Sequence, residues 1–427
     1  MQKRTSFPPV FWVANIIEVL ERFAYYGIYF SFGIYMTSLG YSRDQLGFVQ
    51  TVFLLLSYVI PLLSGTFADR FGFKKVLIVS YLAYLPSILL LILTKSFSGI
   101  ALTMLSIGLA AGIFKPLVSG TVRATTDRSN ATLGFGIFYA MVNVGGSLGP
   151  IVAGKLRVIS WDLSFKVAAA AVVVLLLITV FFYKEPKRDV QQATLAGKFR
   201  DIGIALSDVK FSVFLFLLGV CFWIPFWAFF NLCALYVDKN IDTARLYEAI
   251  RGVFGATFAN FFSREENGTR RVLGETISHT GYIIVVFQLL VSRVFEKFKP
   301  IPSFLTGLVV AALGFLVMGL AGVGAPSLVF LGIFLFAVGE MIASPRIQEY
   351  ITWMAPKEKA GLYMGSNFLA VAIGAFSGVI YTPIYGRFAD AGHAGYVWYV
   401  LAAHLVVSLV VLATFMKVAG GFTQQDA

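Results

Sequence analysis

The sequence predicts an all-α polytopic membrane protein with about twelve transmembrane helices. Hydrophobic residues make up 58% of the 427 residues and charged residues 13%, and the mean hydropathy is +0.81. Soluble domains carry about 25% charged residues, so this composition excludes an ordinary soluble domain. The apolar residues also form long runs, and roughly 20 of them are enough for one helix to cross a bilayer.

Each long apolar run is a candidate membrane helix. The runs cover residues 9–39, 45–67, 74–94, 98–120, 132–154, 163–183, 211–236, 277–295, 302–323, 326–346, 361–386 and 394–416. A basic, polar stretch follows the sixth run. We therefore predict an N-terminal six-helix bundle over 1–183, a cytoplasmic basic linker over 184–210 and a C-terminal six-helix bundle over 211–427.

The basic residues are sorted between alternate loops. Lys and Arg concentrate on the side of both termini, which the positive-inside rule places in the cytoplasm. The same rule explains the net charge of +12, so no nucleic-acid partner is expected. The first run carries charges in its middle and is too long for a cleavable signal peptide. We expect a monomeric integral protein of the bacterial inner membrane.

Residues 237–276 form a long connection on the outer side. Apolar residues recur there at helical spacing, opposite charged ones, which predicts an amphipathic helix. The apolar positions are Leu246, Ile250, Val253, Phe254, Phe258 and Phe261, and the charged ones are Arg245, Glu248 and Arg251. Such a helix lies on the membrane surface or over the pore mouth, or packs as an ordinary extracellular helix. Both interpretations remain open.

The first run contains the unusual stretch I-E-V-L-E-R-F-A-Y-Y-G at 17–27. A charged group at the bilayer centre costs about 2.5–3.5 kcal/mol, and such groups face a bundle interior or an aqueous cavity. Helical spacing puts Glu18 one turn from Glu21 and Arg22, and Tyr25, Tyr26 and Tyr29 continue the stripe. The alternative is an ion pair that locks two helices together, although a lock would need no second carboxylate.

A fourth charge lies in the fourth run, where Lys115 precedes Pro116. A buried lysine needs a counter-charge, and Glu18 or Glu21 is the expected partner. Two carboxylates against Arg22 and Lys115 form a near-neutral cluster. Such a cluster can exchange partners when one carboxylate takes up a proton.

Three further polar residues lie inside predicted helices. Glu340 is an acidic residue within the second half, and its alternative is a salt bridge to Arg346. Asn143 offers a donor and an acceptor for a ligand or for helix–helix contact. His279 opens the eighth run near Tyr282, where a structural role competes with a proton relay.

The stretch G-T-F-A-D-R-F-G-F-K-K at 65–75 links the second and third runs. Gly65 and Gly72 allow a tight turn and a close helix approach. Asp69 can accept from donors at a helix N-terminus, and Arg70 anchors the loop at the cytoplasmic face. This stretch resembles the signature of the major facilitator superfamily, in which it gates the cytoplasmic side. The resemblance implies the major facilitator fold.

Several motifs together resemble the proton-coupled oligopeptide transporter family. They are E-V-L-E-R-F-A-Y-Y-G, F-K-P-L-V-S-G at 114–120, F-Y-A-M-V-N-V-G-G-S-L-G-P at 138–150, and G-E-M-I-A-S-P with A-P-K-E-K-A-G-L-Y-M-G at 339–365. The resemblance implies that Glu18, Glu21 and Arg22 couple protonation to gating. It also implies that Lys115 engages the peptide carboxylate or the glutamates, that Tyr25, Tyr26, Tyr58 and Asn143 line the pocket, and that Glu340 faces the peptide amine.

The chain departs from that family's pattern where the substrate would be recognised. Tyr29 stands where the family commonly has arginine, F-W-I-P-F-W at 222–227 lacks the seventh-helix carboxylate, and Asn367 replaces a tryptophan. The extra central helix pair of bacterial members is also missing. We therefore predict a proton-coupled symporter with a remodelled site for a peptide or peptide-like solute, in which Tyr29, His279 and Asn367 join the substrate contacts.

Two other functions remain open. G-G-S-L-G-P at 145–150 and the aromatic seventh helix fit a proton antiporter that exports drugs or amphiphilic compounds, and a non-transporting receptor is a third possibility. The chain has no H-E-x-x-H and no G-x-x-x-x-G-K, so no enzyme is predicted. Cys221 and Cys233 fall in one helix, so we expect no disulfide and no metal. The expected partners are the substrate, protons and membrane lipid, with no cofactor beyond the proton gradient.

Overall fold

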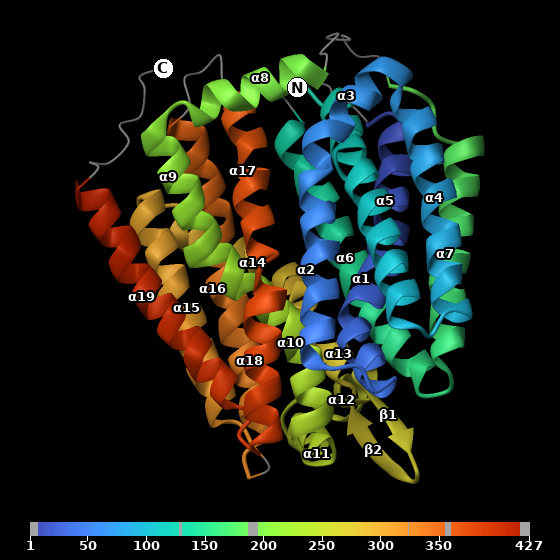
Figure 1. The fold of residues 1–427 in the computed structure, drawn as a ribbon, viewed down its shortest axis with the longest axis vertical. Coiled ribbons are helices and arrows are strands. Elements are labelled where there is room, and N and C mark those ends of the chain that lie inside the picture. The colour runs from blue at the N-terminus through green and yellow to red at the C-terminus, as the bar shows by residue number, and fades with distance from the viewer. Residues whose placement is uncertain (1–6, 128–129, 187–194, 323, 355–359, 419–427) are drawn as a thin grey trace, which may run out of the picture. The chain divides into compact units, whose positions relative to one another are not determined.

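The computed structural model describes residues 7–127, 130–186, 195–322, 324–354 and 360–418. It is almost entirely helical (Figure 1). The helices of the first half are α1 (Pro9–Ser38), α2 (Arg43–Val59), α3 (Pro61–Phe71), α4 (Phe73–Leu93), α5 (Phe97–Ala124), α6 (Ala131–Arg157), α7 (Trp161–Phe181) and α8 (Leu195–Leu206).

The second half begins with α9 (Val209–Leu218), a π-helical turn (Gly219–Trp223) and α10 (Ile224–Asn240). The segment between α10 and α13 holds α11 (Thr243–Phe254), α12 (Ala256–Phe261) and the strands β1 (Ser263–Glu266) and β2 (Thr269–Val272). The remaining helices are α13 (Gly274–Ser278), α14 (Gly281–Phe295), α15 (Pro300–Leu320), α16 (Ser327–Met354), α17 (Ala360–Gly374), α18 (Ser377–Asp390) and α19 (Tyr396–Val418).

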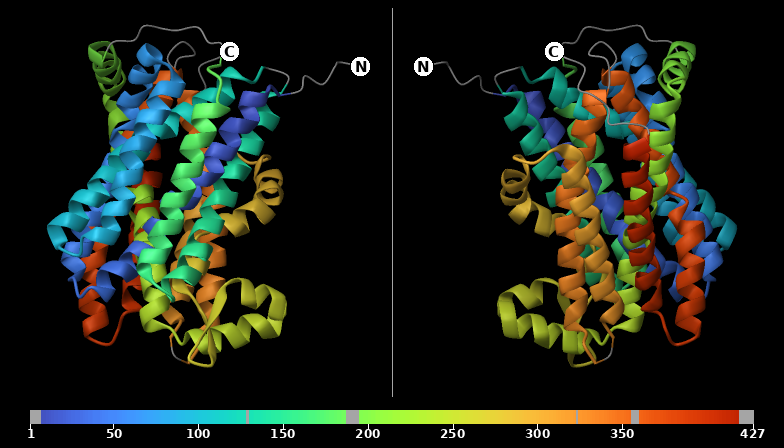
Figure 2. Two further views of the ribbon diagram at one scale, coloured as in Figure 1. Left: turned by 90° about the vertical axis from the view of Figure 1, so that its right-hand side faces the viewer. Right: turned by 90° about the vertical axis from the view of Figure 1, so that its left-hand side faces the viewer.

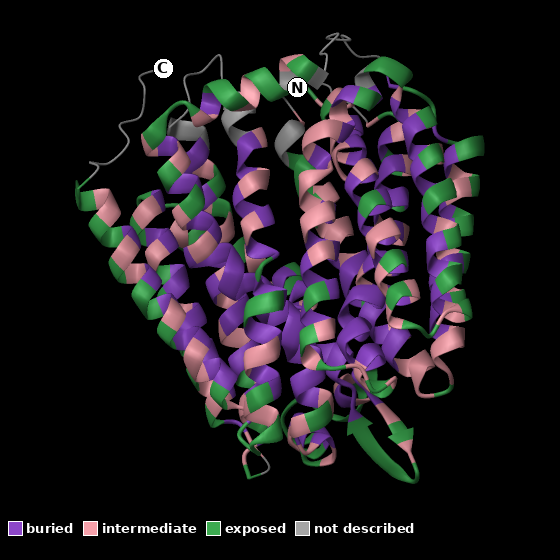
Figure 3. Cartoon of the chain, in the orientation of Figure 1, coloured by how far each residue is buried: buried purple, intermediate pink, exposed green. Residues whose placement is uncertain are grey.

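The predicted polytopic membrane fold is confirmed. Within the described residues, eleven helical segments are long and apolar enough to cross a membrane. The 30-residue α1, whose apolar run three charges interrupt, brings the number to twelve. Exposed apolar side chains such as Leu93, Phe181 and Leu289 lie on the helix surfaces, and Figure 3 shows exposed positions alternating with buried ones along most helices. Lipid contact accounts for such apolar surface.

Internal contacts divide the chain into two compact units. Unit 1 comprises Met1–Tyr29 and Val52–Phe199, and unit 2 comprises Phe30–Thr51 and Arg200–Ala427. The division passes through α1 and α2, so each of these helices contributes to both units. The first half of α2 joins unit 2 through polar contacts: Gln50 Nε2 donates to the Asn231 carbonyl at 3.1 Å, and Thr382 Oγ1 donates to Gln50 Oε1 at 2.7 Å.

Four membrane spans that were predicted as continuous helices are interrupted. Pro61 separates α2 from α3, because proline has no N–H to donate and favours the first turn of a helix. The π-helical turn lies directly before Pro225, whose missing N–H leaves a carbonyl of the preceding turn without its usual donor. The predicted span 277–295 breaks between α13 and α14, and the span 361–386 breaks between α17 and α18.

Side chains from neighbouring helices satisfy the backbone at two of these interruptions. Thr51 Oγ1 accepts from the N–H of Val379 in the first turn of α18 at 2.9 Å. His404 Nε2 contacts the Val220 carbonyl in the π-helical turn at 3.0 Å. A carbonyl can accept but not donate, so His404 carries its proton on Nε2 and accepts the Tyr381 hydroxyl at Nδ1. The breaks therefore carry no backbone penalty at these atoms.

Within residues 237–276 the sequence pattern predicted one amphipathic helix, and this prediction is wrong beyond residue 254. In α11, Leu246 and Ile250 are buried as expected, whereas Val253 is 75% exposed. Gly255 then adopts φ 84° and ends the helix. An antiparallel hairpin follows α12, with Ser263 opposite Val272. Figure 2 shows this hairpin beside α11 and α12 at one end of the unit 2 helices.

The hairpin turn has a sequence signal that the helical pattern obscured. Asn267 and Gly268 form the turn with φ of 51° and 75°. Asn-Gly is the preferred pair for a two-residue hairpin with positive φ at both positions. Asn-Gly between two short polar strands therefore predicts this turn.

In unit 1, α6 crosses α1 very closely at two glycines spaced four residues apart. A Cβ on Gly145 would lie 2.3 Å from the Val19 carbonyl oxygen, and one on Gly149 would lie 2.2 Å from the Phe23 carbonyl oxygen. Small residues at this spacing let helix backbones approach in membranes. The crossing fixes the part of α1 that carries the charged stretch.

We predict that Gly149→Ala destabilises the protein, because the added methyl must push α6 away from α1. Overpacking of this kind costs about 1–3 kcal/mol, so the melting temperature in detergent should fall by a few degrees. Gly136→Ala on the same helix is the control, since a Cβ there has no neighbour within 4 Å. Equal melting temperatures for the two variants would contradict the close crossing.

Candidate functional site

The charged residues of α1 form a buried ionic cluster in unit 1. Arg22 Nε donates to Glu18 Oε1 at 2.7 Å, and Arg22 Nη1 lies 3.5 Å from Glu21 Oε2. Both glutamates are fully buried, and Arg22 is 8% exposed. The guanidinium also lies over the rings of Tyr26 and Phe114, 5.8 and 5.5 Å from their centroids. Arg22 is thus the centre of the cluster.

The cluster holds one more carboxylate than its arginine can neutralise. Neither oxygen of Glu21 accepts a hydrogen bond from a described residue, and the same holds for Glu18 Oε2. A buried carboxylate without donors is costly, and one proton would remove both the excess charge and part of that cost. The geometry therefore provides a place for one exchangeable proton.

Lys115 on α5 does not pair with Glu18 or Glu21, which corrects the expected partner. In the described part of the chain, its Nζ lies 4.2 Å from the Tyr58 ring centroid and 4.6 Å from that of Tyr25. Its hydrogen-bond acceptor is the Ser57 carbonyl, at 3.4 Å. Aromatic faces attract a desolvated ammonium by about 2 kcal/mol. That attraction explains how the lysine lies inside unit 1 apart from the carboxylates.

Tyrosines from three helices of unit 1 surround these charges. Tyr25 donates to Ser57 Oγ at 3.3 Å and stacks with Tyr29 at a centroid distance of 6.2 Å. Tyr29 also stacks on Phe53 at 5.5 Å. The structure thus brings eight of the predicted residues together in unit 1. They are Glu18, Glu21, Arg22, Tyr25, Tyr26, Tyr29, Tyr58 and Lys115.

Sequence reasoning missed two further tyrosines, Tyr81 and Tyr84 on α4. Both side chains are fully buried, and their hydroxyls have no hydrogen-bond partner among the described residues. The Tyr81 ring lies 6.1 Å from the ring of Phe114, which also packs against Arg22. The signal was the i, i+3 spacing of two phenols in an otherwise apolar run, which places both on one helix face.

Asn143 on α6 is 6% exposed. Its Nδ2 donates to the Tyr139 carbonyl of its own helix at 2.9 Å. The donor of the amide is thus engaged one turn back on α6. A ligand contact by Asn143 stays a prediction.

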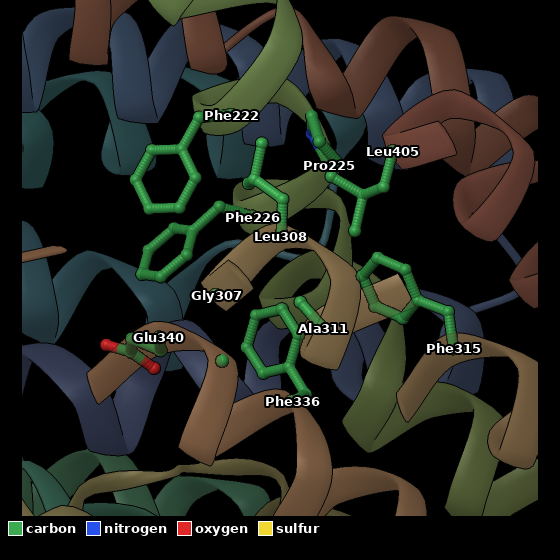
Figure 4. Close-up of a pocket in the computed structure, with 11 residues that line it drawn as sticks. Phe222, Pro225, Phe226, Gly307, Leu308, Ala311, Phe315, Phe336, Glu340 and Leu405 are labelled. Carbon is green, nitrogen blue, oxygen red and sulfur yellow. The ribbon is translucent and has the colours of Figure 1, made fainter. Parts of the chain in front are cut away.

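In unit 2, Glu340 on α16 accepts from Thr280 Oγ1 at 2.9 Å. The alternative salt bridge to Arg346 is wrong, because Arg346 Nη1 pairs with Glu349 Oε2 at 2.6 Å. Glu340 also borders a small pocket whose other lining residues are apolar and include Phe222, Phe226 and Phe336 (Figure 4). Thr280 lies at the break between α13 and α14, so this interruption supplies the donor for the carboxylate.

His279 lies in the same break and is 7% exposed. Its Nδ1 accepts from the Gly281 N–H at 2.9 Å, and its ring packs against Phe30 at a centroid distance of 5.0 Å. These contacts support its structural role at the start of α14. A substrate contact stays a prediction.

Asn367 on α17 is 9% exposed, and its Oδ1 has no hydrogen-bond partner within the described chain. Gly374, two turns later on α17, packs against Trp223 and Trp227. The indole N–H of Trp223 is likewise buried without an acceptor among the described residues. Asn367 on α17 and Trp223 in the π-helical turn therefore each have a buried polar atom that makes no hydrogen bond to a described residue.

The stretch at 65–75 is mostly helical rather than a loop, which corrects the prediction. Gly65, Asp69 and Arg70 lie in α3, and the turn consists of Gly72 with φ 89°. The side chain of Asp69 lies outside the described residues. The N-terminus of α4 is capped by Glu185, whose Oε1 and Oε2 accept from the N–H groups of Phe73 and Lys74 at 2.8 and 2.9 Å. Residues 355–359 of the tenth-helix motif also lie outside the described chain.

In the described residues, eleven candidate membrane spans together with α1 and its buried ionic cluster define a polytopic membrane protein of the secondary-transporter type. The chain belongs to the Major Facilitator Superfamily, whose family model matches residues 14–379. It is therefore an integral membrane transporter and not an enzyme. In the described residues no group of three or more His, Cys, Asp or Glu side chains could hold a metal ion.

Curated relatives include a quinolone resistance protein. The quinolone resistance protein NorA of Staphylococcus aureus is 26% identical over 235 residues, which cover 54% of this chain and 60% of NorA. The match thus spans less than two thirds of NorA's length. The uncharacterized MFS-type transporter YqjV of Bacillus subtilis is 21% identical over 419 residues, covering 97% of this chain and 95% of YqjV.

Solved structures with the same fold include peptide transporters. A POT family transporter in complex with a thioalcohol conjugated peptide has a TM-score of 0.74 at 19% identity, covering 95% of this chain and 96% of that chain. Another, in complex with 5-aminolevulinic acid, has a TM-score of 0.73 at 18% identity, with the same coverage of each chain. The nucleoside transporter NupG has a TM-score of 0.77 at 14% identity, covering 96% of this chain and 100% of NupG. At these identities the likeness shows the fold.

We predict that Arg22→Met strongly lowers the melting temperature, because two buried carboxylates lose their counter-charge. Breaking a buried pair in this way costs about 3–5 kcal/mol. Arg123→Met is the control, since Arg123 is an exposed arginine of the same unit. Adding Glu18→Gln to Arg22→Met should recover part of the loss. The cluster would be unimportant for stability if Arg22→Met melted like Arg123→Met.

Proposed function

We propose that the chain is a proton-coupled symporter that imports a peptide or peptide-like solute. The observation that carries this proposal is the buried cluster in which two carboxylates face one arginine while Lys115 stays apart. Glu21 is the proposed proton carrier, because it makes the longer contact with Arg22 and none of its oxygens accepts a hydrogen bond in the described chain. The likeness in fold to POT family transporters supports the same proposal.

A proton on Glu21 changes the charge balance around Arg22. With Glu21 neutral, Arg22 pairs with Glu18 alone and the cluster has no net charge. With Glu21 ionised, the cluster is negative, and Lys115 is the cation of unit 1 that can compensate it. We propose that this exchange couples protonation to the conformation of unit 1.

Each unit, taken by itself, holds a charged group that suits a peptide-like solute. Lys115 in unit 1 is a cation with no carboxylate partner among the described residues, and Glu340 in unit 2 is a carboxylate bound by a hydroxyl. The Lys115 ammonium suits the carboxylate of a peptide, and the Glu340 carboxylate suits an amine. Proposed further contacts are Tyr25, Tyr26, Tyr29, Tyr58, Asn143, His279 and Asn367.

We also propose that the protein lies in a bacterial inner membrane as a monomer with both termini in the cytoplasm. The concentration of Lys and Arg in alternate loops supports this orientation. The stretch at Gly65, Asp69, Arg70 and Gly72 then gates the cytoplasmic side, with Gly72 as its hinge and Glu185 as the cap that holds α4.

Export of drugs by proton antiport is the second candidate. The likeness to NorA and the aromatic residues around the π-helical turn favour it. The direction of flux separates the two functions. With an inward proton gradient across proteoliposomes, a symporter accumulates its solute, whereas an antiporter drives the solute the other way. The solute is first found by thermal-shift screening against di- and tripeptides, peptide-like natural products and drugs.

We predict that Glu21→Gln abolishes proton-driven uptake but keeps counterflow of labelled against unlabelled solute. The amide cannot ionise, so the proton gradient can no longer act on this residue, whereas the solute still binds. Asp162→Asn, which removes an exposed ion pair with Lys95, is the control and should keep both activities. Loss of counterflow together with driven uptake would show that Glu21 has a structural role instead.

We also predict that Lys115→Met removes the preference for peptides with a free carboxylate over their C-terminal amides. A charge-assisted hydrogen bond contributes about 1.5–3 kcal/mol, so the wild-type preference should be about tenfold or more and the variant should show none. Binding is measured by titrated thermal shift. Lys166→Met, an exposed lysine on α7, is the control. An unchanged preference in Lys115→Met would exclude this lysine as the carboxylate site.

A further inference from the structure

A long apolar groove lies on unit 1 between α3, α4 and α5, separate from the charged cluster. Its volume is about 540 Å³, within the range of roughly 300–1,000 Å³ that is typical of ligand pockets. Its lining includes Ile60, Phe67, Phe71, Val79, Leu109 and Ile113. Phe67, Phe71, Val79 and Leu109 are between 40% and 62% exposed. The groove is therefore open on the side of the helices.

The sequence explains why the groove exists. A Cβ on Gly112 would lie 2.6 Å from Ile60 Cβ, so α5 and the end of α2 are in close contact at this point. Pro61 then starts α3, and bulky Phe67 and Phe71 line the groove further along. Ser64, which also lines it, donates its hydroxyl to the Gly112 carbonyl at 3.4 Å and so adds no free polar group. The interior of the groove is apolar.

The length of the groove matches one leaflet of a bilayer. Ile60 and Phe71 both line it and are eleven residues apart. At a rise of 1.5 Å per residue, this stretch of chain spans about 16 Å. The hydrocarbon core is about 30 Å thick, so one leaflet measures about 15 Å. An acyl chain of a single leaflet therefore fits along α3.

Two cations lie at the end of the groove nearest the α3–α4 turn. Lys75 lines the groove, is exposed and forms no ion pair in the described chain. Arg70 lies with its guanidinium 5.3 Å from the ring centroid of Phe71, another lining residue. Neighbouring Lys74 differs, because it donates to the Val180 carbonyl at 2.8 Å. Lys75 and Arg70 form no ion pair among the described residues, and the positive-inside rule places this turn at the cytoplasmic surface, where lipid phosphates lie.

We propose that this groove binds one anionic phospholipid, with an acyl chain along α3 and the phosphate at Lys75 and Arg70. The apolar lining favours an acyl chain, the length of the groove matches one leaflet, and the two cations favour a negative headgroup. Each basic residue near the membrane surface contributes about 1 kcal/mol to the attraction of anionic lipid. The bound lipid touches α3, α4 and α5 on both sides of the Gly72 hinge, so it stabilises this arrangement of the three helices.

The test measures lipid binding to the purified full chain in neutral detergent. Native mass spectrometry counts bound lipid during titration with phosphatidylglycerol or phosphatidylcholine of identical acyl chains. The wild type should retain one phosphatidylglycerol preferentially. Val79→Trp, which fills the groove, should weaken that binding at least tenfold. Leu82→Trp is the control, because Leu82 is an exposed residue of α4 that does not line the groove.

A second pair of variants tests the groove independently, in case Val79→Trp does not fold. Leu109→Trp on α5 should weaken binding as Val79→Trp does, whereas Leu102→Trp, an exposed position on the same helix outside the lining, should not. Lys75→Gln should remove about fivefold of the preference for phosphatidylglycerol, and Lys166→Gln should leave it intact. The assay involves no transport, so failure of the proposed symport would not affect it.

Two results would overturn the proposal. One is equal phosphatidylglycerol binding by Val79→Trp, Leu109→Trp and their controls. The other is binding of uncharged drug-like compounds, but of no phospholipid, that is lost in the tryptophan variants. That result would indicate an entry route for apolar cargo.

Discussion

The need to neutralise charge inside a dry helix bundle governs unit 1. Arg22 is held between Glu18 and Glu21 and against two aromatic rings, in surroundings where an unpaired charge is far more costly than in water. This arrangement requires α1 to be fixed in rotation and depth. The glycines of α6 provide that restraint, because the close crossing at Val19 and Phe23 leaves little freedom for the turn between them. The close packing of the α6 glycines thus positions the charged side chains of α1.

Elsewhere in the chain, polar contacts gather where helices are interrupted. Thr280, at the break between α13 and α14, binds Glu340. His404 binds the π-helical turn, and Thr51 binds the first turn of α18. Glu185 binds the first turn of α4 beyond Gly72. An interruption frees backbone donors and acceptors, which need partners in a membrane. The polar side chains that satisfy them are therefore at positions where a helix can bend.

Much of the fold could be predicted from the sequence, because a membrane span leaves a long apolar run and a proline removes a backbone donor. The charged stretch of α1 was predictable for a related reason: three ionisable groups in one apolar run have few alternatives to mutual contact. The π-helical turn was not predictable, since it depends on a partner, His404, that is almost two hundred residues away. The partner of Lys115 was predicted wrongly, because charge complementarity was considered without the aromatic faces of Tyr25 and Tyr58. Tyr81 and Tyr84 were missed because phenols in an apolar run also fit ordinary packing.

The position of Lys115 bears most directly on the choice between the two proposed functions. If this lysine merely balanced the surplus carboxylate, the lowest-energy position for its ammonium would be beside Glu18 or Glu21. It lies instead between two tyrosine rings, where a cation remains attractive to a second anion because aromatic faces leave its net charge uncompensated. An apolar or cationic drug gains nothing from such a group, whereas a carboxylate does. The aromatic side chains of unit 2 suit an apolar cargo, but they equally suit the side chains of a peptide. Since Lys115 forms no ion pair among the described residues, it favours a solute with a carboxylate, and the aromatic residues favour one with bulky apolar substituents.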